Sequence, residues 1–189
     1  MSLAPTDYDF GAPANYAFAE KITCSNDEAR RMYIEAFGHM LNYNHEQAIA
    51  CFTKCTELDP NCAMAWWGIA YCLSSSYNWS AGLGPGYDAI SQAVSLKDHC
   101  SELEQDLIMA LSKRHTKEAR DNANPAALNM GNSPELNQAF ADAMAPLYEK
   151  YSGDLDVTAV YVEALMNLNP WTLWNNCLLY TSDAADEPL

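Results

Sequence analysis

Four of the seven cysteines fall within a short stretch of the chain and could hold a metal ion. They are Cys51, Cys55, Cys62 and Cys72. Cys51 and Cys55 are one helical turn apart, so a helix would place both thiols on the same face. The paired Cys-x-x-Cys spacing of structural zinc sites is nevertheless absent from the sequence. Because free cysteines are among the residues most often buried, we interpret these four as core side chains and predict no metal and no cofactor.

The histidines do not predict an acid–base site. His39, His45, His99 and His115 are dispersed, and none lies in a local motif with a Ser or Cys nucleophile. We expect His45 to be a solvated side chain in a first helical turn. We expect His39 to be a packed ring rather than a general base.

Two further patterns also favour structure over catalysis. The glycine-rich run at 82–86 follows no strand and has no Lys-Ser/Thr after it, so it does not predict a phosphate-binding loop. The paired acids Glu102/Glu104 and Asp154/Asp156 come at the starts of predicted helices, where the positive end of the helix dipole stabilises them. We interpret both pairs as helix-start residues rather than as a catalytic dyad, and we predict no enzymatic activity.

The candidate residues lie on helices whose ends are marked in the sequence. A Ser or Asn followed three residues later by Glu or Gln is typical of a capping box. Such pairs are Ser25 with Glu28, Ser101 with Glu104 and, as a weaker version, Asn44 with Gln47. Ser133 precedes Pro134, which predicts a cap followed by proline at the first helical position. Pro60 and Pro170 each end a helix.

These signals and the spacing of apolar residues predict an all-α protein. The predicted helices cover residues 26–42, 45–58, 61–75, 86–97, 101–115, 134–151 and 155–168. No alternating pattern predicts a strand. The segment 116–132, rich in Asn, Ala and Gly, is expected to be a long connection.

The chain also repeats itself. Met32, Ala36 and His39 lie 34 residues before Trp66, Ala70 and Leu73. A period of this length is typical of stacked helix pairs. Residues 66–73 fit the first-helix pattern of a tetratricopeptide repeat, and Ala48, Phe52 and Pro60 fit the second-helix pattern. The chain therefore resembles the tetratricopeptide repeat (TPR) family, which implies an α-solenoid of antiparallel helix hairpins.

The resemblance extends over about residues 7–174. A second copy of the second helix appears at Ala89, Ala93 and Leu96, so its repeat carries a loop insertion at 74–87. The runs 43–71 and 163–171 are similar to a group of larger bacterial and fungal TPR proteins without a defined biochemical role. Their arrays continue further, so we expect this chain to be truncated at its C-terminus.

The resemblance implies a binding groove. In the TPR family one face of each first helix lines a concave groove, and here that face carries Arg30, Tyr33, Phe37, Met64, Trp67 and Tyr71. Aromatic residues and Arg are frequent in binding hot spots, so this face could hold a peptide or a helix. The alternative is that the N-terminal arm or the next hairpin covers it. Within the repeat we expect Trp66 in the core and Trp67 on the groove. Apart from Arg30, the residues with which some members bind a chaperone's C-terminal carboxylate are missing.

The C-terminal segment does not resemble the rest of the chain. Residues 177–189 lack helical periodicity, and one codon choice for 177–187 resembles a transposase end followed by a sequencing adapter. The alternative is a real C-terminal strand with an acidic tail. The predicted organisation is an extended arm at 1–24, two TPR-like repeats at 25–98, degenerate helical repeats at 99–174 and a non-native tail at 175–189. Self-association through the truncated end is expected.

Composition narrows the classes of partner. The chain has 25 acidic and 10 basic side chains, for a formal net charge of -15, which would repel nucleic acid and anionic membranes. The longest apolar run, 62–73, is shorter than the roughly 20 residues of a membrane-spanning helix. Without a secretory signal we expect a cytoplasmic protein with reduced thiols. The predicted function is a protein-interaction scaffold. The alternative is a repeat array supporting a small-molecule or catalytic site completed by residues missing from this sequence.

Overall fold

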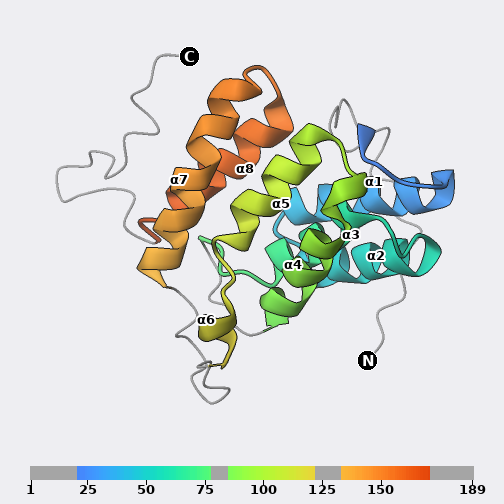
Figure 1. Cartoon of the computed structure of the whole chain (residues 1–189), viewed down its shortest axis with the longest axis horizontal. Coiled ribbons are helices and arrows are strands. Elements are labelled where there is room, and N and C mark those ends of the chain that lie inside the picture. Colours follow the sequence, from blue (N-terminus) through green and yellow to red (C-terminus); the bar gives the residue numbers. More distant parts are fainter. Residues whose placement is uncertain (1–20, 78–84, 122–132, 171–189) are drawn as a thin grey trace.

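The all-α prediction is confirmed. The computed structural model describes residues 21–77, 85–121 and 133–170, and these ranges form helices without a β-strand element (Figure 1). The helices are α1 (Asp27–Leu41), α2 (His45–Leu58), α3 (Ala63–Cys72), α4 (Pro85–Leu96), the short 3₁₀ helix η2 (Lys97–His99), α5 (Glu102–Ser112), α6 (Lys117–Asp121), α7 (Pro134–Lys150) and α8 (Leu155–Met166). Most of the predicted arm, part of the loop insertion and the predicted tail lie outside these ranges.

The predicted helices agree closely with the observed ones. The prediction for 45–58 matches α2, whereas α3 is shorter at both ends than the predicted 61–75. The helix α6 lies inside the predicted connection. Its start is capped by Thr116, whose Oγ1 accepts a hydrogen bond from the Ala119 amide. Arg120 then fixes this helix to α4 through an ion pair with Asp88. The long-range ion pair is a contact that local patterning does not reveal.

The predicted caps are correct at two helices and wrong at two others. Ser101 and Glu104 form the predicted capping box, and Ser133 accepts a hydrogen bond from the Leu136 amide. The first helix is instead capped by Asn26, whose side chain accepts a hydrogen bond from the Ala29 amide. The Ser25 amide donates to the Asp59 carboxylate 34 residues away. Asn44 makes no side-chain cap hydrogen bond.

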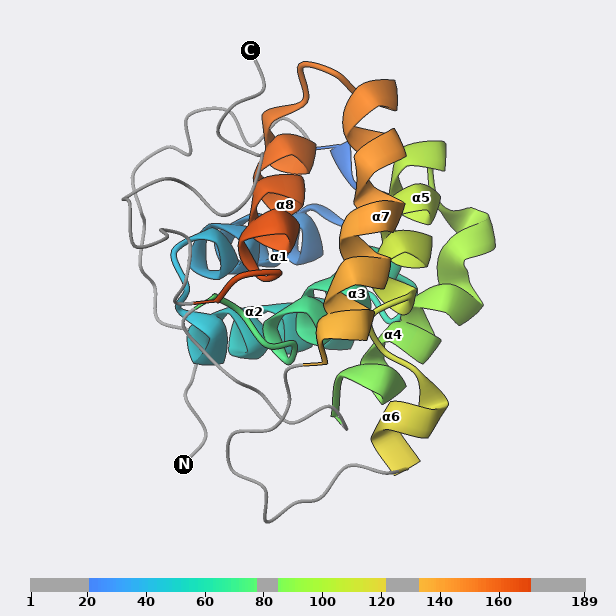
Figure 2. The ribbon, with the colours of Figure 1, turned by 90° about the vertical axis from the view of Figure 1, so that its left-hand side faces the viewer.

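The helices pack as hairpins in two orientations. The hairpin α1–α2 stacks on α3–α4, and α5 continues from α4. The hairpin α7–α8 runs across this stack, and α7 packs against α5 (Figure 2). One hydrophobic core extends through both groups and contains residues of α1, α2, α3, α4, α5, α7 and α8.

Small residues allow the repeat helices to approach closely. Ala36, Ala48 and Ala70 are fully buried, as the repeat pattern predicts. At Gly68 of α3, an added Cβ would lie 2.3 Å from Cζ of Phe52 in α2. Glycine is therefore required here by the close approach of α2 and α3 rather than by backbone conformation.

Candidate functional site

The predicted groove residues do not line an open groove. Tyr33, Phe37, Met64 and Trp67 are fully buried and Tyr71 is 3% exposed. Of the six predicted residues, Arg30 alone is half-buried. The prediction of an exposed binding face at these positions is therefore wrong, and the alternative of a covered face describes them better. The predicted N-terminal arm, which was one candidate for the cover, lies almost entirely outside the described residues.

Helices of the same chain cover this face. The indole Nε1 of Trp67 donates to the backbone carbonyl of Leu107 in α5 at 3.1 Å. The Tyr71 hydroxyl donates to the Glu163 carboxylate of α8. Trp67 thus lies in the core and Trp66 is half-buried, the reverse of the predicted assignment. The reason is that α5 packs against the side of α3 that the repeat pattern leaves for a ligand.

The helix α8 contacts the predicted groove through Glu163. The Glu163 carboxylate accepts the hydrogen bond of Tyr71 of α3. Burial raises the pKa of Tyr33 of α1, with smaller contributions from nearby ionisable groups, of which Asp156 is the least. Asp156 and Glu163 are seven residues apart, so they lie on one face of α8. Val160 lies between these two residues in the sequence, and its side chain is buried in the hydrophobic core. The last turn of α8 therefore lies against Tyr71, one residue of the face where the resemblance implied a peptide or helix.

A buried arginine joins the two groups of helices. The guanidinium of Arg114 donates to the side chain of Asn137 in α7 at 2.9 Å and to the backbone carbonyl of Ser75 after α3. It also lies 5.7 Å from the centre of the Phe140 ring. Burial raises the pKa of Glu163, an effect that Tyr71 and Arg114 oppose. These contacts connect the ends of α3 and α5 with α7 and α8.

His115 has a serine partner that local motifs did not reveal. Its Nε2 lies 2.8 Å from the Ser74 hydroxyl, and both side chains are buried. The Ser74 hydroxyl also lies 2.9 Å from the Ala70 carbonyl, to which it can donate. Burial, with a smaller effect of Arg114, lowers the pKa of His115 to about 4. The pair therefore links the segment after α3 to the segment after α5.

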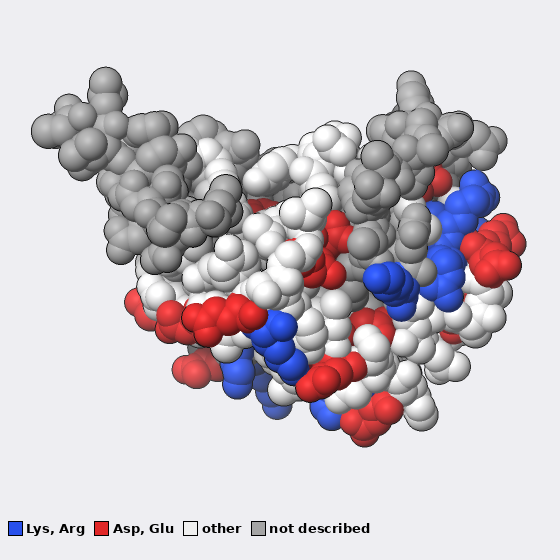
Figure 3. Space-filling model, turned by 90° about the horizontal axis from the view of Figure 1, so that it is seen from above, with Lys and Arg blue, Asp and Glu red and all other residues white. Residues whose placement is uncertain are grey.

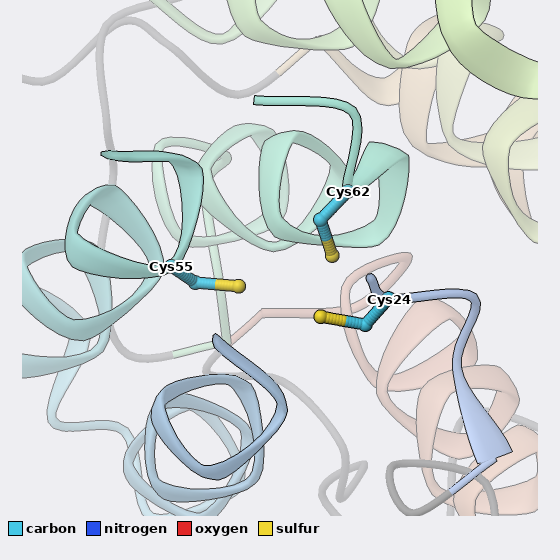
Figure 4. Close-up of side chains that lie close together, drawn as sticks. All are labelled: Cys24, Cys55 and Cys62. Atoms are coloured by element: carbon cyan, nitrogen blue, oxygen red, sulfur yellow. The ribbon is translucent and has the colours of Figure 1, made fainter. Parts of the chain in front are cut away.

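Three cysteines from separate segments form a thiol cluster. The Sγ atoms of Cys24, Cys55 and Cys62 all lie within 4.8 Å of one another. Figure 4 shows them pointing toward one another from the segment before α1, the last turn of α2 and the start of α3. Burial raises the pKa of Cys24 to about 11. Three converging thiols can bind a soft metal ion when deprotonated.

The predicted cysteine set is only partly brought together. Cys51, Cys55, Cys62 and Cys72 are all buried, as predicted. Cys51, however, lies with Glu35 and His39, whose ligand atoms are within 4.8 Å of its thiol. The His39 ring is buried, as expected, and burial lowers its pKa. Cys24, which completes the thiol cluster, was not among the predicted candidates because it lies 31 residues before Cys55.

Charged side chains on the described surface are interspersed. On the face shown in Figure 3, Lys and Arg lie next to Asp and Glu. Lys150 binds both Glu102 and Asp106 at 2.7 Å, and Arg120 binds Asp88 and Asp121. These four ion pairs place the basic groups of α6 and α7 beside carboxylates.

No protein-family model, no curated protein and no solved structure matches the chain. Among the helices of the described ranges, none combines the length and the apolar character that crossing a membrane requires.

Proposed function

We propose that this protein is a helical-repeat scaffold of TPR type whose first-helix face binds helices. This face consists of Tyr33, Phe37, Met64, Trp67 and Tyr71, and below it is called the helix-binding face. The observation that carries the proposal is the contact of α8 with it through Glu163 and Tyr71. According to this proposal α8 is an intramolecular ligand of the helix-binding face, and a helix of a partner protein competes with α8 for the same face.

The contacts of α8 define the chemistry of such a partner. Val157, Val160 and Ala164 of α8 are buried in the common core, so the partner helix requires small apolar residues at this i, i+3, i+7 spacing. The partner helix also requires a carboxylate three residues after the position equivalent to Val160, where Glu163 of α8 accepts the hydrogen bond of Tyr71. Trp67, held by α5, forms the fixed floor of the face.

Competition between α8 and an added copy of its own sequence tests this proposal. A fluorescent peptide of residues 154–170 is titrated into the whole chain and into its Glu163→Ala variant. The variant loses the intramolecular hydrogen bond, whereas the peptide keeps Glu163 and can form it with Tyr71. A hydrogen bond to a charged group contributes about 1.5–3 kcal/mol, so we expect the variant to bind the peptide roughly tenfold more tightly, or more.

Two controls identify the binding site. Adding Tyr71→Phe to the Glu163→Ala chain should remove the gain in affinity, because the donor on the helix-binding face is lost. A peptide with Val160→Asp should not bind, because the buried apolar contact becomes charged. Equal affinity of the wild-type and Glu163→Ala chains, or binding that ignores Tyr71→Phe, would contradict the proposal.

A further inference from the structure

We propose that Cys24, Cys55 and Cys62 form a binding site for a thiophilic d¹⁰ metal ion, Zn²⁺ or Cu⁺. Their Sγ atoms lie within 4.8 Å of one another. With Zn–S bonds of about 2.3 Å, three thiolates around one ion stand about 3.8–4.0 Å apart. The sulfur atoms therefore need to contract by at most about 1 Å to share an ion, which rotation about the Cα–Cβ bonds can supply.

The segment that carries Cys24 is held in place against the other two cysteines. Asp59, at the end of α2, accepts a hydrogen bond from the Ser25 amide at 2.6 Å. Arg30 donates to the Ile22 carbonyl at 2.7 Å and to the Cys24 carbonyl at 3.3 Å. The Thr23 amide donates to Glu104 of α5 at 2.7 Å. Every residue from 22 to 25 is thus bonded to a helix, so the position of the Cys24 thiol does not depend on an unrestrained segment.

The other two thiols lie at fixed helix ends. Cys55 is in the last turn of α2, and Cys62 is the N-cap residue of α3, a helix of 10 residues. The side-chain hydrogen bond with Cys55 and burial raise the pKa of the Cys62 thiol well above its ordinary value, so this thiol is protonated until an ion binds. Both side chains are fully buried. The thiols of Cys55 and Cys62 are therefore held in place before an ion binds.

Two charged side chains, Asp59 and Arg30, lie beside the cluster. Ion binding releases the three S–H protons to solvent and forms three metal–sulfur bonds, which leaves a net charge of -1 on a Zn²⁺ site. The carboxylate of Asp59 lies beside the cluster, and Arg30 provides a positive charge at the Cys24 backbone. Asp59 uses one oxygen for Ser25 and the other for Asn61, so we assign it to the outer shell of the site. Such outer partners orient metal ligands.

The neighbouring group of Glu35, His39 and Cys51 is the natural comparison. It also brings three potential ligand atoms within 4.8 Å of one another, but it contains a single thiol. Soft ions such as Cu⁺ and Zn²⁺ prefer thiolate ligands. The thiol cluster is therefore the preferred site of the two.

Metal titration of the whole chain tests the proposal. The protein is stripped with a chelator under a phosphine reductant and titrated with Zn²⁺ and, separately, with Cu⁺, each against a competing chromophoric chelator. We expect one ion per chain, and we expect Cys24→Ser and Cys62→Ser to weaken its binding by roughly 100-fold or more. Titration with Co²⁺ should give thiolate-to-metal charge-transfer absorption that both variants lose. The ion with the lower dissociation constant in the same buffer is the one that the site prefers.

Matched controls separate this site from the alternatives. Cys72→Ser removes a buried thiol outside the cluster, and His39→Ala disables the neighbouring group, so both should bind the ion as the wild type does. Cys24 is only half-buried, so Cys24→Ser should retain the helical circular dichroism of the wild type even if Cys62→Ser does not. The proposal is overturned if neither ion binds, if a folded Cys24→Ser chain binds normally, or if His39→Ala or Cys72→Ser abolishes binding.

Discussion

At the scale of single residues, adjacent side chains have different roles. Trp66 and Trp67 follow each other on α3, where successive side chains point about 100° apart. The repeat pattern places Trp66 inside the hairpin, but α5 covers the opposite side and buries Trp67 fully. A large aromatic residue that the sequence pattern places on a binding face, such as Trp67, can therefore become a core residue when another helix of the chain packs against it.

Replacing the two tryptophans in turn measures this difference. Trp67→Ala should lower the free energy of unfolding by about 3–5 kcal/mol, because a fully buried ring and its hydrogen bond to Leu107 are lost. Trp66→Ala, at a half-buried position, should cost clearly less. Urea unfolding followed by circular dichroism gives both values. An equal or larger loss at Trp66 would mean that the repeat-based assignment is the correct one.

At the scale of elements, the hairpins depend on close approach at small residues. The helices α2 and α3 approach each other closely at Gly68, which faces the fully buried Phe52 ring. The ring also packs against Tyr33 of α1, with 5.4 Å between ring centres, so it has little room to move away. The packing of α2 against α3 at this point therefore depends on the fit between Gly68 and Phe52.

Gly68→Ala should destabilise the protein although alanine is the better helix former. The helix propensity gain is about 1 kcal/mol, and we expect overpacking of about 1–3 kcal/mol to exceed it. Adding Phe52→Leu should make the Gly68→Ala substitution less costly than it is in the wild type, because the clashing ring is removed. A double-mutant cycle from urea unfolding measures this coupling. Additive effects would show that the two residues are not in contact.

At the scale of the whole molecule, the two groups of helices meet at a buried polar junction. Arg114, Ser75 and Asn137 link the end of α5 and the segment after α3 to α7. Beside them, His115 bonds to Ser74 and contacts Gly86, where an added Cβ would lie 2.2 Å from the ring. Such a junction stabilises one arrangement of the helices but is sensitive to the protonation of its histidine.

The stability of the protein should therefore fall in mild acid. The pKa of His115 is about 4 in the folded chain against 6.5 for an ordinary histidine, so the unfolded chain binds the proton first. Its contribution is complete above about pH 6.5 and is lost as the pH falls toward about 4, up to about 3 kcal/mol. Thermal unfolding across this range should show a weaker pH dependence for His115→Gln than for the wild type. The exposed His99→Gln should behave as the wild type. Identical profiles for His115→Gln and the wild type would contradict this prediction.

The helices, their approximate ends and two of the caps could be predicted from the sequence. These features depend on residues within a few positions of one another: apolar spacing, Ser101 with Glu104, and Ser133 before Pro134. The small buried residues of the repeat were predictable for the same reason, because periodicity records which side of a helix meets its hairpin partner. That the four predicted core cysteines are buried also follows from their apolar neighbours.

The use of each buried face was decided by the tertiary structure. Periodicity predicts that the face of α1 and α3 that carries Tyr33 and Trp67 is apolar. It does not distinguish between a bound ligand, the N-terminal arm and a later helix as the cover, because each would pack against the same apolar residues. Contacts over long distances in the sequence selected α5 and α8 as the cover, through Leu107 and Glu163. The thiol cluster arises in the same way, because Asp59 and Arg30 bring Cys24 to Cys55 and Cys62. Local patterns cannot encode such contacts, since the residues that make them become neighbours only after the helices have packed.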